Sequence, residues 1–222
     1  MNWLARRRYP RWSARLHAGT RLRDLSGVVL DCETTGLRPF DGDRLVSVFA
    51  VAVDSLAITE QSFGTLVSPG VPIPPEATAI HGITDQMVGT APSPGDAVTG
   101  LREFVGNCPV VGQVVSFDLA FLDPIARRNR LAPFPVALDT LLMSTVLWPE
   151  RDIRHGLDAL AERLGIEVVD RHTARGDALA TARTFVAMVP MMEERGLMTV
   201  RDVVAACQAT PRAAEFAKRY RR

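Results

Sequence analysis

The order in which apolar patterns follow one another constrains the fold of this chain more than any other feature. An apolar run from Val28 to Leu30 predicts a buried strand. Two further runs, 45–53 and 58–67, are rich in β-branched and aromatic residues and lie only a few residues apart. Strands joined by such short connections favour an antiparallel meander.

After Pro94 the pattern changes to alternating helix and strand. A meander followed by βαβ units predicts an α/β fold, with a mixed sheet covered by helices on both faces. The expected elements of this half are helices at 97–105, 117–130 and 157–164 and strands at 109–115 and 136–138.

The chain has 222 residues, enough for one sizeable domain with tails. We expect a basic N-terminal extension at 1–26, one domain at 27–190, and a helical basic C-terminal tail at 191–222. The formal net charge of +1 conceals basic ends and a middle of about −9. We hypothesise that the basic ends capture a polyanion, with a docking or unstructured role as the alternative.

The cysteines indicate a reducing compartment. The chain has an odd number of cysteines, which lie far apart and form no C-x-x-C pair: Cys32, Cys108 and Cys207. This pattern argues against a disulfide framework or a zinc knuckle. No apolar run reaches the roughly 18 residues of a membrane helix. We therefore expect a cytoplasmic protein that does not bind a membrane.

The first strand carries two acids on one face. Alternation places Asp31 and Glu33 together, with Cys32 on the opposite face. Side chains two residues apart on a strand lie about 6 to 7 Å apart. Like charges at this separation repel unless a cation lies between them. A pair of solvated acids at the end of a strand is the structural alternative.

Two more acids open helices. Asp118 lies in the first turn of the helix after the fourth strand, and Asp177 begins a later helix, five residues after His172. The helix dipole alone stabilises an acid in a first turn, so each is ordinary by itself. Ligand sites of α/β sheets gather at the carboxyl ends of strands, however. Four carboxylates there would suit Mg²⁺ or Mn²⁺, and two such ions perform nuclease chemistry.

Three segments resemble the exonuclease motifs of the DEDDh family, whose members include proofreading epsilon subunits of bacterial replicative polymerases. They are V-V-L-D-C-E-T-T-G-L at 28–37, S-F-D-L-A-F-L at 116–122 and H-T-A-R-G-D at 172–177. The resemblance covers about residues 27–190. Similar segments lie in order between these motifs: I-H-G-I-T at 80–84, L-D-T at 138–140 and L-D-A-L-A-E-R-L-G at 157–165.

The resemblance implies a ribonuclease H-like fold, a mixed five-stranded sheet with helices on both faces, and removal of mononucleotides from a 3' end with two Mg²⁺ or Mn²⁺ ions. It implies that four acids are the metal ligands and that His172 is the general base. The residues implied to contact substrate have structural alternatives: they could form a turn, cap a helix or pack in the core. The ligands would be Asp31, Glu33, Asp118 and Asp177, and the substrate contacts Thr34, Thr35, Gly36, Leu37, His81 and Phe117.

The chain departs from the family pattern at two places. Gln113 and Val114 stand where many relatives have a His-Asn pair, which affects substrate contact and not the metal ligands. Residues 191–222 show neither a polymerase tether nor a Gln-rich clamp-binding peptide. A polymerase partner is therefore possible but has no support in the tail.

The leading hypothesis is a 3'-5' exonuclease that releases 5'-mononucleotides from single-stranded DNA, in proofreading or repair. The expected partner is therefore a nucleic acid with a free 3' end. An exoribonuclease acting on short RNA or RNA 3' ends is the alternative within enzymes. A non-catalytic nucleic-acid-binding module is the alternative of another class. Retention of all five catalytic residue types argues against the last.

Overall fold

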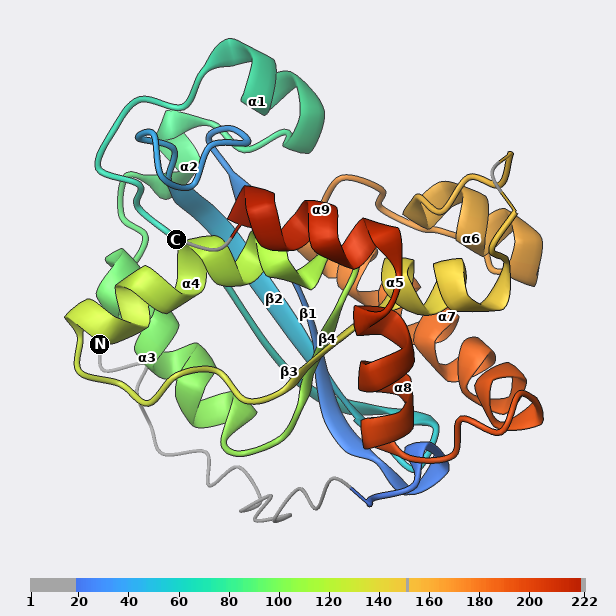
Figure 1. The fold of residues 1–222 in the computed structure, drawn as a ribbon. Coiled ribbons are helices and arrows are strands. Elements are labelled where there is room, and N and C mark those ends of the chain that lie inside the picture. The colour runs from blue at the N-terminus through green and yellow to red at the C-terminus, as the bar shows by residue number, and fades with distance from the viewer. Residues whose placement is uncertain (1–18, 151, 221–222) are drawn as a thin grey trace.

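The computed structural model describes residues 19–150 and 152–220, so most of the expected extension at 1–26 lies outside the described residues. Five strands form one sheet in the order β3-β2-β1-β4-β5 (Figure 1). The elements are η1 (Leu22–Asp24), β1 (Ser26–Thr34), β2 (Leu45–Asp54), β3 (Ala57–Leu66), α1 (Pro75–His81), α2 (Asp85–Val88), α3 (Pro94–Val105), β4 (Val110–Gly112), α4 (Val115–Arg128), β5 (Ala137–Asp139), α5 (Thr140–Leu147), α6 (Leu157–Leu164), α7 (Ala174–Glu194), α8 (Val200–Gln208) and α9 (Pro211–Tyr220).

The sheet is mixed, which confirms the predicted meander followed by βαβ units. Strand β1 pairs antiparallel with β2, and β2 pairs antiparallel with β3. On its other edge β1 pairs parallel with β4, which pairs parallel with β5. The carboxyl ends of β1, β4 and β5 therefore meet at one edge of the sheet, where a ligand site of an α/β fold is expected.

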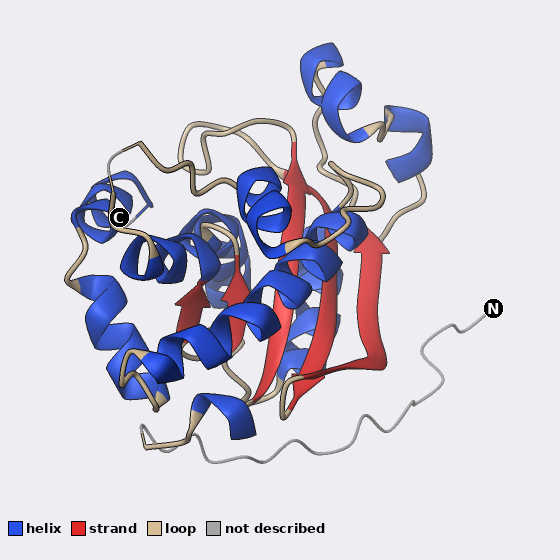
Figure 2. Cartoon of the chain, turned by 90° about the vertical axis from the view of Figure 1, so that its right-hand side faces the viewer, coloured by secondary structure: helices blue, strands red, loops and turns tan. Residues whose placement is uncertain are grey.

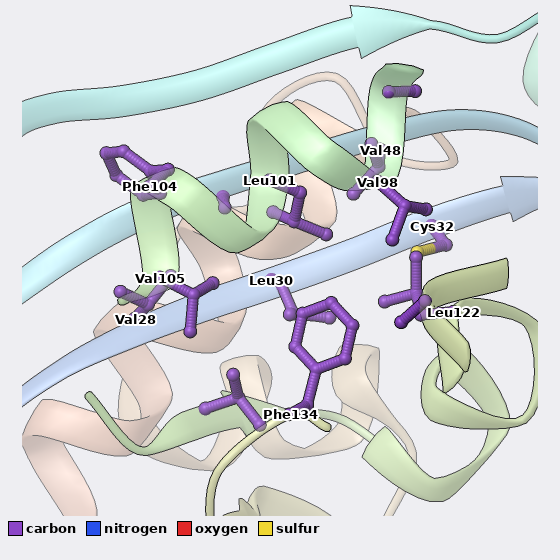
Figure 3. Packing of buried hydrophobic residues seen from close by; sticks show 14 of the residues in the cluster. Val28, Leu30, Cys32, Val48, Val98, Leu101, Phe104, Val105, Leu122 and Phe134 are labelled. Carbon is purple, nitrogen blue, oxygen red and sulfur yellow. The ribbon is translucent and has the colours of Figure 1, made fainter. Parts of the chain in front are cut away.

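Helices cover both faces of the sheet, as the sequence predicts (Figures 1 and 2). Leu30 of β1 is fully buried on one face, where it packs with Leu101 of α3 and Leu122 of α4 (Figure 3). Val29, the neighbouring residue, packs on the opposite face with Phe185 of α7. Each fully buried side chain of this kind contributes about 1.5 to 3 kcal/mol. One core therefore fixes β1 against α3 and α4, and the other fixes β1 against α7.

The packed unit extends beyond the expected domain of 27–190 at both ends. Leu22 and Leu25 are buried with the α7 face of the sheet, although they lie within the Arg-rich segment. Helix α7 continues through Pro190 to Glu194 because Met192 still faces the core. Helix α8 buries Val203 in the same cluster.

Helix α9 lies on the surface and packs against α4, α5 and α8. None of its side chains is buried. Among the described residues, no helix has the length and apolar character that crossing a membrane requires.

Candidate active site

Three of the four predicted acids meet at the carboxyl end of β1. Carboxylate oxygens of Asp31, Glu33 and Asp177 all lie within 4.8 Å of one another. Strand β1 supplies the first two because alternation places them on the face that α7 covers. Helix α7 supplies Asp177 from its first turn. The cluster therefore depends on the packing of α7 against β1.

Asp118 adjoins this cluster from the other side of β1. It lies in the first turn of α4, and its side chain is buried, with 3% exposed. The thiol and the backbone amide of Cys32 both interact with its carboxylate. The Asp118 charge also raises the pKa of Asp31. The structure thus brings all four predicted acids into one electrostatic unit.

The pKa values of these acids lie above their ordinary range. Burial raises the pKa of Asp31 well above its ordinary value, and the charges of Asp118, Asp177 and Glu33 raise it further. Burial and the Asp177 charge raise the pKa of Glu33 to about 8. Burial also raises the pKa of Asp118 to about 8, against the lowering effect of Cys32. Acids with such pKa values ionise at neutral pH only when a cation lies nearby.

The loop before α7 is shaped by its backbone. Asp170 and His172 both have positive φ, 55° and 62°. A Cβ at Gly176 would meet the carbonyl oxygen of Asp170 at 2.0 Å, so only glycine fits one residue before Asp177. The His172 side chain is exposed, while its backbone N–H donates to Asp177 Oδ1 at 3.3 Å. The predicted general base thus stands at the rim of the acidic cluster.

Arg171 is the functional candidate that the sequence reasoning missed. Its Nε donates to Asp158 Oδ1 at 2.6 Å, and its Nη1 donates to Asp177 Oδ2. Nη1 also lies 3.3 Å from His172 Nδ1. The guanidinium lowers the pKa values of Asp31 and Glu33 and so balances part of their charge. The signal was its place next to His172 in the third motif.

The predicted substrate loop follows β1 directly. Thr34 Oγ1 donates to the Gly36 carbonyl at 2.7 Å, and the backbone N–H of Thr35 donates to the Arg44 carbonyl at 2.9 Å. A Cβ at Gly36 would lie 2.5 Å from the Asp43 carboxylate, which explains the glycine. Leu37 is 67% exposed at the rim. The loop is held rigidly while this one apolar side chain projects from it.

His81 and Phe117 occupy different settings. His81 is buried, and its Nδ1 accepts from the backbone N–H of Ile83 at 3.0 Å. The imidazole also interacts with the backbone of Thr34, which links α1 to the substrate loop. The Phe117 ring is half-buried and packs edge-on against Phe121, with centroids 5.2 Å apart. His81 therefore acts on the loop from behind.

The unusual Gln113 and Val114 lie at the entry to α4. Gln113 Nε2 donates to the His155 carbonyl at 2.8 Å, and Thr140 Oγ1 donates to Gln113 Oε1 at 2.5 Å. Val114 has the left-handed backbone, with φ 58° and ψ 44°, which is rare for a β-branched residue. The Gln113 side chain is thus engaged within the protein.

Comparisons with known proteins identify the family of the chain. The exonuclease family RNase T matches residues 28–185. A DNA polymerase III subunit epsilon-like protein of Rhodobacter capsulatus is 43% identical over 195 residues, which cover 84% of this chain and 27% of that protein. The chain thus spans about a quarter of that relative's length.

Solved structures share the fold. Exonuclease X in complex with 5' overhanging duplex DNA is 27% identical, with a TM-score of 0.62 over 81% of this chain and 98% of that one. E. coli exonuclease I in complex with a dA16 oligonucleotide is 22% identical, with a TM-score of 0.66 over 77% of this chain and 42% of that one. These likenesses confirm the ribonuclease H-like fold of the exonucleases. The chain belongs to the DnaQ-like 3'-5' exonuclease family, whose members are hydrolytic nucleases.

Proposed function

We propose that this chain is a two-metal-ion 3'-5' exonuclease that releases 5'-mononucleotides from the 3' end of single-stranded DNA. The observation that supports it most strongly is the group of three carboxylates within 4.8 Å, with Asp118 beside it. A role in proofreading or repair follows from its likeness to an epsilon-like protein. We keep the cytoplasm as its compartment because Cys32, Cys108 and Cys207 are all unpaired.

The residues of the site fit Mg²⁺ or Mn²⁺. The donors are carboxylate oxygens, which these hard ions prefer. Burial first, and the neighbouring carboxylates second, raise the pKa values of Asp31 and Glu33, so a cation would favour their charged forms. Asp31, Glu33, Asp118 and Asp177 would hold the ions. When bound, the ions would stabilise negative charge on the attacking and leaving oxygens of the phosphodiester.

The other side chains have separate tasks in this proposal. His172 accepts the proton of the attacking water, since it is exposed at the rim and is tied to Asp177 only through its backbone N–H. Leu37 and the rigid loop of Thr34, Thr35 and Gly36 position the terminal nucleotide. His81 supports that loop from behind.

Two observations bear on the alternatives. E. coli exonuclease I and exonuclease X, both solved with DNA, share the fold of this chain, which favours DNA over RNA as the substrate. A non-catalytic module would not need four acids with unfavourable mutual repulsion in one place. No observation supports a polymerase partner beyond the name of the R. capsulatus relative.

The test uses DNA and RNA oligomers of matched sequence, labelled at the 5' end, with Mg²⁺, Mn²⁺ or a chelator. We expect DNA to shorten stepwise from the 3' end with either metal, and a circular single strand to stay intact. Cleavage of the circle, or faster cleavage of RNA, would contradict the proposal. The His172→Ala variant should lose roughly 10² to 10⁴ in rate, while its Mn²⁺ affinity, measured by calorimetry, stays near normal.

A further inference from the structure

Helix α9 ends beside the candidate active site, at a residue that the proposed function does not use. The ring of Tyr220 lies edge-on to the ring of Phe117, with centroids 5.8 Å apart and an interplanar angle of 78°. Phe117 immediately precedes Asp118 in α4. Figure 1 shows α9 extending along the same side of the molecule as α4. The C-terminal helix therefore brings an aromatic side chain against Phe117, the residue that precedes the buried Asp118.

A groove with a volume of about 370 Å³ runs over the outer surface of α4 at this point. Tyr220 lines it, and so does Phe40, which comes from the loop after β1 that also carries Leu37. Leu119 and Arg127 of α4 contribute to its lining. The groove thus has aromatic residues from two separate elements, and α4 adds the oppositely charged Asp123 and Arg127.

The exposed charged side chains of α9 are three basic residues and one acidic residue. Lys218 and Arg219 are exposed, and the Arg219 guanidinium lies 5.4 Å from the Tyr220 ring centroid. Arg212 pairs with Glu215, the helix's acidic residue, at 3.1 Å. Lys218 and Arg219 thus place two positive charges next to Tyr220, where they can attract a polyanion.

Core packing does not explain why α9 lies here. None of its side chains is buried, and a cavity of about 460 Å³ lined by Leu142, Cys207 and Phe216 lies beneath it. A helix that buries so little apolar surface gains little from its position. Lys218 and Arg219 are exposed to a ligand instead, and the Tyr220 ring, which packs on Phe117 by its edge, is partly exposed.

We propose that this groove binds an unpaired nucleotide of the single-stranded substrate, upstream of the two nucleotides that flank the scissile phosphate. The base packs against Tyr220 and Phe40, and the backbone phosphates lie near Lys218 and Arg219. Stacking on aromatic rings together with a basic track is how proteins hold single strands without reading their sequence. The proposal rests on the proposed nuclease function, of which it extends the substrate site.

The test compares a thymidine dodecamer, which reaches the groove, with a thymidine dinucleotide, which does not. We measure the Kd of a fluorescein-labelled dodecamer with Ca²⁺ present, and kcat/KM for cleavage of the dinucleotide with Mn²⁺. Tyr220→Ala should weaken dodecamer binding roughly tenfold and leave dinucleotide cleavage unchanged. Tyr220→Phe, which keeps the ring, should bind the dodecamer like the wild type.

The basic residues have a separate readout. Arg219→Ala should reduce the slope of log Kd against log salt concentration by about 1 for the dodecamer, because one phosphate contact is lost. An unchanged slope together with unchanged binding in Tyr220→Ala would overturn the proposal.

Two other outcomes would also overturn it. Faster cleavage of both substrates by Tyr220→Ala would show that α9 obstructs the site. Equal losses on both substrates, with a lower melting temperature, would show that Tyr220 only packs α4. Failure of the nuclease function is distinguishable from all of these, since the wild type would then cleave neither substrate, whereas the groove is scored by binding.

Discussion

Two buried aspartates at the same edge of the sheet, Asp118 and Asp139, have opposite roles. Asp139 ends β5, and its carboxylate accepts from the backbone N–H groups of Val115 at 3.0 Å and Leu141 at 2.9 Å, with two longer bonds to Val114 and Leu142. It caps the entries of α4 and α5 together. Asp118 stands among other acids and has Cys32 as its main source of hydrogen bonds.

The difference appears in their protonation. Burial raises the pKa of Asp139 to about 6. The rise stops there because four backbone N–H groups donate to the carboxylate and stabilise its charge. Burial raises the pKa of Asp118 to about 8, since it has fewer donors. Depth of burial therefore does not separate a structural carboxylate from a candidate metal ligand. The direction of the surrounding dipoles and charges does.

The sharpest test replaces each aspartate by alanine. Asp139→Ala should lower the free energy of unfolding by about 2 to 4 kcal/mol, because two helix entries lose their cap and buried N–H groups lose their acceptor. Asp118→Ala should nearly abolish cleavage while leaving metal-free stability above pH 8 unchanged or higher, because there it removes a buried charge that its neighbours repel. Urea unfolding with a chelator, and cleavage assays with Mn²⁺, measure the two effects.

A destabilised Asp118→Ala protein, or a fully stable Asp139→Ala protein, would reverse the assignment of roles. Asp118→Asn provides a control that keeps the shape of the side chain and removes only the charge. It should behave like Asp118→Ala in cleavage.

The dependence of stability on pH sharpens the same contrast. Carboxyl groups titrate near 4 in an unfolded chain, while the folded pKa values of Glu33 and Asp118 are about 8. Between pH 4 and pH 8 the folded protein therefore binds more protons than the unfolded chain. The contribution of these two groups to the free energy of unfolding is greatest below pH 4 and falls until about pH 8.

Metal-free protein should lose roughly 2 kcal/mol of unfolding free energy per pH unit across pH 6 to 8, because Glu33 and Asp118 each contribute about 1 kcal/mol per pH unit. Asp139 contributes in the same direction only up to its pKa of about 6. Glu33→Gln combined with Asp118→Asn should flatten the profile above pH 6. A wild-type profile that rises with pH in chelator would contradict the raised pKa values.

Much of this site was predictable, for physical reasons that differ between residues. Asp31 and Glu33 follow from strand alternation, and Asp177 from its place at the start of a helix, because local geometry fixes these positions. The cap formed by Asp139 was not predicted, because it depends on where the α4 entry passes relative to β5. Burial of Leu22 and Leu25 was missed because their Arg-rich surroundings hide a short contact with α7.

Arg171 is the cation that contacts the acidic cluster. In the acidic cluster the Arg171 side chain supplies the positive charge, and a mutation can remove it. At Asp139 the backbone N–H groups stabilise the carboxylate, and no side-chain mutation removes them. Arg171→Gln should bind Mn²⁺ roughly tenfold more tightly, because a cation that competes for Asp177 is lost. Asp158→Asn is the matched control and should weaken Mn²⁺ binding, since Arg171 then pairs with Asp177 alone. Calorimetry without substrate measures both, and weaker binding by Arg171→Gln would show that the guanidinium organises the ligands.

The smallest effect concerns the strained backbone that Asp139 holds. Val114 has φ 58°, and its N–H donates to Asp139 Oδ1 at 3.3 Å. A β-branched residue in this left-handed region costs about 1 kcal/mol or more, and glycine avoids that cost. Val114→Gly should therefore raise the free energy of unfolding by about 1 kcal/mol, although glycine also loses more chain entropy on folding.

Val186→Gly, the same change within helix α7, should lower the free energy of unfolding by at least about 1 kcal/mol, which separates backbone strain from a general effect of glycine. Equal destabilisation by the two variants would mean that the Val114 side chain contributes more through packing than its backbone costs through strain.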